Sequence, residues 1–248
     1  MEIPGAVLTA VGADAVWSRD HEGNSGGVWK VSGAAGTFFA RCGQTAALEH
    51  QRLRWLAGRI EVPAVAAFAD GEQPWLVLAD VRAPSLPAAR LSDPAEAGTI
   101  MGRLLRRLHS LPVRDCPFRS PVATLVDQAR RRVAENLVDH DDFDDDHRGA
   151  TPGALLERLV ELRPPDADLA VTHGDFCPDN VLLRPDGSAV LIDVSRLGVA
   201  DRHRDIALAR RNLADDFGTE AVDAFTAASG FDPDPDRLYW YRLLDEFF

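Results

Sequence analysis

The segment VTHGDFCPDNVLLRPDGSAVLID, residues 171–193, constrains the fold of this chain more than any other part of it. A short apolar run leads into the tripeptide HGD, and the run VLL after Asn180 is typical of a second strand. The PDGS tetrapeptide then predicts a turn, from which a third strand returns to Asp193. We therefore expect a strand, a loop and a hairpin that bring Asp175, Asn180 and Asp193 together at one end.

This combination of side chains has a specific chemistry. Two carboxylates and an amide are hard oxygen ligands of the kind that suits Mg²⁺. In phosphoryl transfer, one Asp accepts the proton of the attacking hydroxyl, while an Asn and a second Asp hold the metal ions that bridge the phosphates. A single Asp in a loop more often caps a helix or faces solvent in a turn. The three residues together, at this spacing, indicate phosphoryl-transfer chemistry.

Composition excludes several other classes of protein. The 248 residues carry a net charge of −12, which argues against nucleic acid or an anionic membrane as the main partner. No apolar run approaches the roughly 20 residues that span a bilayer, and the first residues lack the basic start of a signal peptide. The 3 cysteines are far apart and predict neither a disulfide framework nor a zinc site. We expect a cytoplasmic monomer.

The remaining patterns predict two lobes. Short β-favouring runs at 28–32, 37–42, 62–69 and 74–81 surround a helical pattern at 45–58, which predicts a small antiparallel sheet with one helix. A Pro- and Ala-rich connector follows residue 82. Helices are then expected from the Ser92-Asp93-Pro94 cap to about His109, at 121–138, at 153–162 and over most of 201–248. We expect a small β-rich lobe at 1–80 and a larger, mainly helical lobe at 81–248.

The segment from residue 171 resembles the catalytic region of the aminoglycoside 3′-O-phosphotransferases, the kanamycin and neomycin kinases. Residues 138–149 (VDHDDFDDDHRG), 195–209 (SRLGVADRHRDIALA) and 241–248 (YRLLDEFF) also resemble blocks of that family. The resemblance covers most of the chain and is weakest before residue 20. It implies an α+β, protein-kinase-like, two-lobed fold with a small antiparallel-sheet N-lobe and a larger, mainly helical C-lobe. The lobe at 1–80 would then bind the nucleotide, and the lobe at 81–248 would carry the catalytic and substrate-binding residues. It also implies ATP- and Mg²⁺-dependent phosphorylation of an aminoglycoside hydroxyl, expected to be the 3′-hydroxyl, which confers antibiotic resistance.

The resemblance assigns roles to the residues singled out above. Asp175 would be the catalytic base, Asn180 and Asp193 would bind magnesium, and Asp205 would brace the catalytic loop. The residues implied to contact the nucleotide are Ser25, Gly26 and Val28 of the loop 22–28, then Arg41 and Glu49, and finally the backbone of Ala79 and Val81.

One residue departs from the family pattern at the nucleotide site. Kinases of this type carry a lysine on the third strand, and this chain has Arg41 there. Its single lysine, Lys30, falls on the preceding strand, where we expect it to face solvent. Arginine keeps the charge and can clamp phosphates, although its planar fork differs from the point charge of lysine. We expect Arg41 to take the phosphate role, with Glu49 as its partner.

The substrate side is expected to be acidic, because aminoglycosides are polycations. Six aspartates fall within residues 139–146. Alone, such a run is more typical of a solvated turn, but in the family it faces the antibiotic. The residues implied to bind substrate are Asp142, Asp144, Asp145, Arg196, Arg211, Asp245, Glu246 and Phe248, the last through its terminal carboxylate. Ser195 replaces a usual glycine and Asn212 a usual acidic residue, so substrate preference is expected to differ from the family's usual one.

Two other classes of function remain open from the sequence. A related kinase could phosphorylate streptomycin, a hydroxylated peptide antibiotic or choline with the same core, although the acidic loop and the YRLLDEFF end favour aminoglycosides. A nucleotide- or drug-binding protein with little or no catalysis is the second class, because Arg41 replaces the lysine. An acidic metal-dependent hydrolase, which would not require ATP, is more distant.

Overall fold

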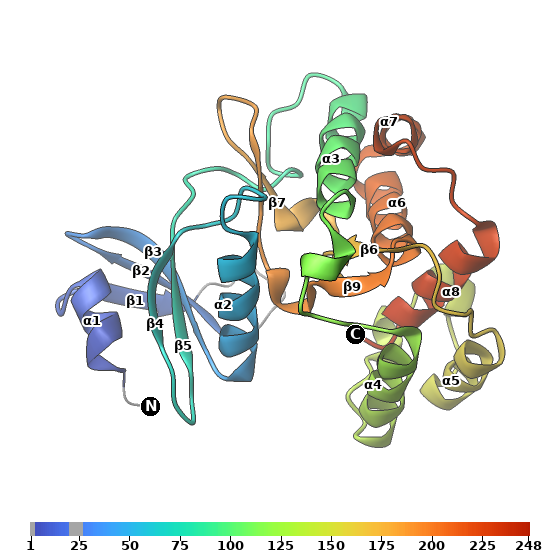
Figure 1. The fold of residues 1–248 in the computed structure, drawn as a ribbon, viewed down its shortest axis with the longest axis horizontal. Coiled ribbons are helices and arrows are strands. Elements are labelled where there is room, and N and C mark those ends of the chain that lie inside the picture. Colours follow the sequence, from blue (N-terminus) through green and yellow to red (C-terminus); the bar gives the residue numbers. More distant parts are fainter. Residues whose placement is uncertain (1–2, 20–26) are drawn as a thin grey trace. The chain divides into compact units, whose positions relative to one another are not determined.

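The computed structural model describes residues 3–19 and 27–248. The chain forms two compact units (Figure 1). Unit 1 contains Met1–Ala89 together with Asp179–Arg196, and unit 2 contains Arg90–Pro178 together with Leu197–Phe248. A segment from late in the chain therefore belongs to the N-terminal unit.

Within the described residues, unit 1 is built on an antiparallel sheet of five strands in the order β1-β2-β3-β5-β4. The strands are β1 (Val16–Arg19), β2 (Val28–Gly33), β3 (Gly36–Cys42), β4 (Val65–Ala69) and β5 (Trp75–Ala79). The four predicted strands are confirmed, with β4 and β5 shorter than expected. A strand was expected before the loop 22–28 without stated bounds, and β1 is that strand, whereas the preceding helix α1 (Gly5–Val11) was not predicted.

The two faces of this sheet carry different helices. Side chains alternate along a strand, and Phe38 and Ala40 of β3 join Val7 and Val11 of α1 in one buried cluster. Arg41 directly follows Ala40 and so points to the opposite face, where α2 (Gln44–Leu56) packs on β5 and β3. Figure 1 shows α1 and α2 on opposite sides of the sheet. This alternation directs the cationic side chain toward α2.

The late segment of unit 1 is a hairpin. Strand β7 (Val181–Leu183) pairs antiparallel with β8 (Ala189–Leu191), as the PDGS turn predicts. The hairpin is fixed to the rest of unit 1 by Leu86 N–H, which donates to Val181 O at 2.8 Å, and by Leu191 N–H, which donates to Glu61 O at 2.9 Å. A short 3₁₀ turn, η5 (Val194–Arg196), follows the hairpin and packs on α2.

Unit 2 is mainly helical. Its helices are α3 (Pro94–His109), α4 (Val122–Ala134), α5 (Pro152–Glu161), α6 (His203–Phe217), α7 (Thr219–Ser229) and α8 (Pro235–Asp245). Strands β6 (Leu169–Thr172) and β9 (Gly198–Asp201) pair antiparallel, although β9 was not predicted. The expected cap at the start of α3 is confirmed, because Asp93 accepts the Ala95 N–H and Pro94 begins the helix. Helix α4 was expected to reach residue 138, but it ends at Ala134. Asn136, two residues later, has a left-handed φ of 54°.

Helices α3 and α7 approach each other closely through glycines. A Cβ on Gly98 would lie 1.9 Å from the Ala221 carbonyl oxygen, and one on Gly102 would lie 2.7 Å from the Phe225 carbonyl oxygen. Only glycine permits this spacing of the two backbones.

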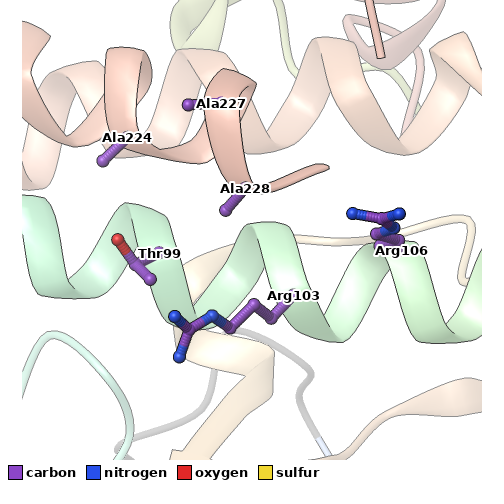
Figure 2. Close-up of a pocket in the computed structure, with 6 residues that line it drawn as sticks. All are labelled: Thr99, Arg103, Arg106, Ala224, Ala227 and Ala228. Atoms are coloured by element: carbon purple, nitrogen blue, oxygen red, sulfur yellow. The ribbon is translucent and has the colours of Figure 1, made fainter. Parts of the chain in front are cut away.

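An open depression of about 500 Å³ lies along the α3–α7 pair, lined by alanines of α7 and by Thr99, Arg103 and Arg106 of α3 (Figure 2). None of its lining residues belongs to the predicted site. Among the described residues, no helix combines the length and the apolar character needed to cross a membrane.

Candidate active site

The β7–β8 hairpin brings two of the predicted metal ligands to the same end. Val181 and Leu191 are opposite each other in the ladder, and Ile192 N–H donates to Asn180 O at 3.0 Å. Asn180 and Asp193 flank this closing pair. Asp193 has a φ of 49°, a left-handed conformation that non-glycine residues rarely adopt. Backbone strain of this kind is concentrated at functional sites.

Arg41 connects this hairpin end to helix α2. Its Nη1 lies 2.9 Å from Glu49 Oε2 and 3.3 Å from Asp193 Oδ1. The Glu49 side chain is 2% exposed and that of Arg41 is 16% exposed. The expected pairing of Arg41 with Glu49 is therefore present in unit 1, and the guanidinium also contacts the carboxylate predicted to bind metal.

Burial and neighbouring charges together set the pKa values of Glu49 and Arg41. Burial raises the pKa of Glu49 to about 7, against the opposing effect of Arg41 and with a smaller contribution from Asp193 in the same direction. Burial would lower the pKa of Arg41, but the charges of Glu49 and Asp193 outweigh it and the pKa is raised. Arg41 thus remains a permanent cation at the position of the family's lysine.

The donor set at the hairpin end fits magnesium. Asn180 and Asp193 supply an amide and a carboxylate, both half-buried, and Mg²⁺ takes such oxygen ligands together with water and phosphate. Ser195 Oγ donates to Asp193 Oδ1 at 3.2 Å and orients the carboxylate. The serine that replaces the family's glycine therefore has a direct contact with a predicted ligand.

The rest of the predicted nucleotide site is partly visible. Ser25 and Gly26 lie outside the described residues, whereas Val28 begins β2 directly opposite Arg41 of β3. Ala79 ends β5, and its N–H donates to Ala64 O at 2.9 Å. Val81 follows β5 and is half-buried. Lys30 is exposed on β2, as expected.

Asp205 holds the predicted catalytic loop of unit 2. This fully buried carboxylate accepts the backbone N–H groups of His173 and Gly174, both at 2.8 Å, and lies 3.0 Å from His109 Nε2. Asp175 N–H in turn donates to His173 Nδ1 at 3.2 Å. The predicted bracing contact of Asp205 is present, and it fixes the backbone directly before Asp175, whose side chain is half-buried.

The pKa of Asp205 reflects these contacts. Burial alone would raise it, but the hydrogen bond and charge of His109, the charge of His173 and the Gly174 N–H outweigh burial and lower the pKa. The carboxylate is therefore ionised in the folded unit.

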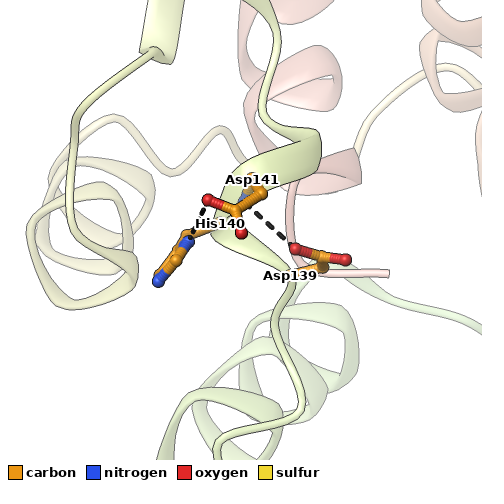
Figure 3. Close-up of side chains that lie close together, drawn as sticks. All are labelled: Asp139, His140 and Asp141. Atoms are coloured by element: carbon orange, nitrogen blue, oxygen red, sulfur yellow. Dashed lines mark hydrogen bonds and ion pairs between the residues drawn. The ribbon is translucent and has the colours of Figure 1, made fainter.

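The acidic run forms two short 3₁₀ turns, η2 (His140–Asp142) and η3 (Asp145–His147). Asp142 and Asp145 are exposed, whereas Asp144 is half-buried. Figure 3 shows Asp139, His140 and Asp141, whose ligand atoms lie within 4.8 Å of one another. All three are exposed and hydrogen-bond among themselves, which is typical of a solvated acidic turn.

Arginines of α6 and α8 contact the half-buried acidic residues. Arg211 lies 2.8 Å from Asp245 and 3.5 Å from Asp144, and Arg242 lies 3.4 Å from Asp144. Asn212 turns toward its own helix, because its Nδ2 donates to Leu208 O at 2.9 Å.

The end of the chain is buried against the acidic run. Glu246 is 9% exposed and Phe247 is fully buried, whereas Phe248 is 36% exposed. Glu246 Oε1 lies 2.5 Å from His147 Nδ1, and both carboxylate oxygens accept the Asp144 N–H at 3.3 Å. The sequence did not single out His147, although it lies in the block 138–149 that carries the family resemblance.

Comparison with known proteins identifies the family of this chain. Residues 16–241 match the model of the phosphotransferase enzyme family. The chain is 44% identical to an aminoglycoside 3′-phosphotransferase of Streptomyces fradiae, over 81% of this chain and 78% of the relative. It is 37% identical to a streptomycin 3″-kinase of Streptomyces griseus, over 98% of this chain and 96% of the relative.

A solved structure supports the same assignment. The crystal structure of an aminoglycoside 3′-phosphotransferase of type VIII superposes with a TM-score of 0.87 at 38% identity, and the match covers 98% of each chain. The predicted α+β, protein-kinase-like fold is thereby confirmed. This chain is an enzyme that belongs to the phosphotransferase enzyme family, among its aminoglycoside kinases.

Proposed function

We propose that this enzyme transfers the γ-phosphoryl group of ATP to a hydroxyl of an aminoglycoside antibiotic, the 3′-hydroxyl in the first instance. The observation that carries the proposal is the Arg41–Glu49–Asp193 contact set, which keeps a half-buried cation beside the carboxylate proposed to bind metal, although the third strand has no lysine. A matching acidic surface in unit 2 supports a polycationic substrate.

The donor nucleotide is handled by residues of unit 1. The Arg41 guanidinium would bind the phosphates, and Glu49 would hold it in place. Because the Ala79 N–H already donates to Ala64 O, the proposed adenine contact of Ala79 uses its carbonyl oxygen. Ser25, Gly26, Val28 and Val81 complete the proposed set. Asn180 and Asp193 would hold Mg²⁺, whose charge offsets that of the phosphates.

Asp175 is the proposed catalytic base. It accepts the proton of the substrate hydroxyl as that oxygen bonds to the γ-phosphorus and the bond to the leaving ADP oxygen breaks. Its backbone is held by the His173 ring, and the preceding turn is held by the buried Asp205. This support fixes the backbone that carries Asp175 before substrate arrives, and positioning is a main contribution a protein makes to phosphoryl transfer.

The substrate amines are the proposed partners of the acidic residues of unit 2. The exposed carboxylates of Asp142 and Asp145 and the half-buried ones of Asp144 and Asp245 carry the attraction. The further proposed contacts are Arg196, Arg211, Glu246 and Phe248. Phosphorylation adds bulk and negative charge to a drug that binds RNA as a cation, and this is the proposed basis of resistance. We also propose that the enzyme acts in the cytoplasm, where ATP is available, and as a monomer.

The test is a transfer assay with Mg-ATP and kanamycin, neomycin, lividomycin and streptomycin, read as a drug product that gains one phosphoryl group. We expect kanamycin and neomycin to be phosphorylated at the 3′-hydroxyl. Lividomycin lacks that hydroxyl, so its modification would point to another position. Asp175→Asn is the matched control, with an expected loss in kcat of about 10²–10⁴-fold. Binding of ATP and drug without transfer to any of the four would contradict the proposal.

A streptomycin kinase is the second candidate, because the streptomycin 3″-kinase relative matches almost the full length of this chain. The neutral Asn212, turned toward its own helix, favours a substrate that does not require an acidic group at that position. Transfer to streptomycin alone in the same panel would favour this candidate.

A further inference from the structure

His147 lies at the junction of the acidic run and the end of the chain. It ends η3, and its side chain is 6% exposed. Its Nδ1 lies 2.5 Å from Glu246 Oε1, and the Glu246 side chain is 3% exposed. The two residues are 99 positions apart in the sequence. This buried contact therefore joins the acidic run to the end of α8, two segments that are far apart in the sequence.

We propose that His147 is a positioning residue for substrate binding, because it holds Glu246 and the acidic run in the arrangement that receives the substrate amines. The inference rests on the proposed function. It adds a residue that touches neither nucleotide nor reacting atoms and that acts through the carboxylates beside it.

The hydrogen bonding of the His147 side chain is directed at Glu246. In the described part of the chain, His147 Nε2 is buried without a hydrogen-bond partner, so the contact of the ring with Glu246 is made through Nδ1 alone. The ring of Tyr239 lies beside it, with centroids 6.1 Å apart. Without the His147 ring, the buried Glu246 carboxylate loses a hydrogen-bond donor, and it will move or take up a proton.

Glu246 passes the effect of His147 to other proposed substrate residues. Both of its oxygens accept the Asp144 N–H, so its position sets the backbone of the acidic run. The Asp144 carboxylate then contacts Arg211, which also binds Asp245 at 2.8 Å. His147 therefore holds Glu246, and Glu246 is linked to the Asp144 and Asp245 carboxylates through the Asp144 backbone and Arg211.

The experiment compares His147→Ala, His147→Gln and wild type in steady-state kinetics with kanamycin and Mg-ATP. For His147→Ala we expect the KM for kanamycin to rise about tenfold, the loss of one hydrogen bond to a charged group. The KM for ATP is expected to stay within about twofold, since His147 contacts no proposed nucleotide residue. In His147→Gln the side-chain amide can donate to Glu246, and we expect at least partial rescue.

Two control variants separate positioning from general loss of structure. His140→Ala removes an exposed histidine of the same run and is expected to leave both KM values unchanged. Phe225→Leu changes a buried residue of α7 and is expected to lower stability without contact with the acidic residues. Thermal melting checks that His147→Ala is no less stable than this variant.

The outcomes distinguish the two proposals. An active wild type whose KM for kanamycin is unchanged by His147→Ala would overturn the role of His147 and leave the proposed function standing. Equal losses for kanamycin and ATP in His147→Ala, without rescue by Gln, would also overturn it. A wild type that transfers phosphate to no aminoglycoside would instead contradict the proposed function.

Discussion

Arg41 of β3 and Glu49 of α2 are joined by a 2.9 Å ion pair in which the glutamate is almost completely buried. The guanidinium extends the contact to Asp193, at 3.3 Å. A lysine ammonium offers three donors around one nitrogen, whereas the planar guanidinium offers five in a fixed fork. In this structure a single nitrogen of that fork, Nη1, contacts both carboxylates.

Replacement of Arg41 tests this contact set. Arg41→Ala leaves the Glu49 carboxylate buried without its cation, and we expect a loss of about 3 kcal/mol in the free energy of unfolding. ATP-dependent turnover is expected to fall at least about tenfold, whereas Arg41→Lys retains most of it. Urea denaturation and initial rates measure the two effects.

The double variant Arg41→Ala/Glu49→Gln separates stability from catalysis. Removal of the buried charge is expected to restore stability but not turnover. Wild-type rates in either alanine variant would show that Arg41 has no role in phosphate binding.

Ser195 offers a test of the metal ligand. Ser195→Gly removes the hydroxyl that donates to Asp193, and it restores the residue usual in the family. We expect the Mg²⁺ concentration for half-maximal rate to rise about fivefold, equivalent to about 1 kcal/mol for one hydrogen bond. Ser188→Gly, in the exposed turn of the same hairpin, is the matched control. The same Mg²⁺ dependence in both variants would contradict the orienting role of Ser195.

Asp205 predicts a dependence of stability on pH. An unfolded Asp has a pKa of about 3.9, and the folded pKa of Asp205 is lower. Its ionised form therefore contributes stability above pH of about 4, and this contribution is lost as pH falls through the folded pKa. We expect Asp205→Asn to be less stable than wild type at neutral pH and to differ from it less as the pH approaches about 3.

Urea denaturation at several pH values measures this difference. Asp14→Asn, at an exposed position, controls for the loss of one negative charge. A difference between Asp205→Asn and wild type that stays constant over the acidic range would contradict the assignment.

The contact of α3 with α7 predicts the cost of an added methyl group. Gly102→Ala would bring a Cβ within 2.7 Å of the Phe225 carbonyl oxygen, and we expect a loss of about 1–3 kcal/mol in unfolding free energy. Gly153→Ala is the matched control, because it lies in α5 with no atom within 4 Å of the added Cβ. That variant is expected to gain up to about 1 kcal/mol from helix propensity. Equal stability of the two variants would contradict close packing at Gly102.

Local patterns predicted much of this fold, and the reasons are physical. Asp93 and Pro94 mark the start of α3 because capping and a fixed φ act within a few residues. The PDGS turn defined the β7–β8 hairpin in the same way. Strand β9 was missed because its four residues form a strand only by pairing with β6, about 30 residues earlier in the chain. Helix α1 is seven residues long and depends on its packing against the sheet.

The site was predictable to different degrees. Short-range spacing suggested Asn180 and Asp193, and the hairpin does bring them to one end. The pairing of Arg41 on β3 with Glu49 on α2 was harder to predict. Strand alternation and helical spacing only suggest which faces of the two elements meet. His147 was missed because its partner is 99 residues away, and a histidine in an acidic run has no local signal. Contacts between residues far apart in the sequence leave no local sequence pattern from which they could be predicted.

The late hairpin of unit 1 has a consequence for how the chain is made. Residues 179–196 supply backbone hydrogen bonds to Glu61 and Leu86, so the N-terminal unit stays incomplete while the ribosome adds nearly a hundred further residues. Long-range pairing of this kind slows folding. During that interval the backbone around Glu61 and Leu86 lacks the hydrogen-bond partners that the hairpin later supplies.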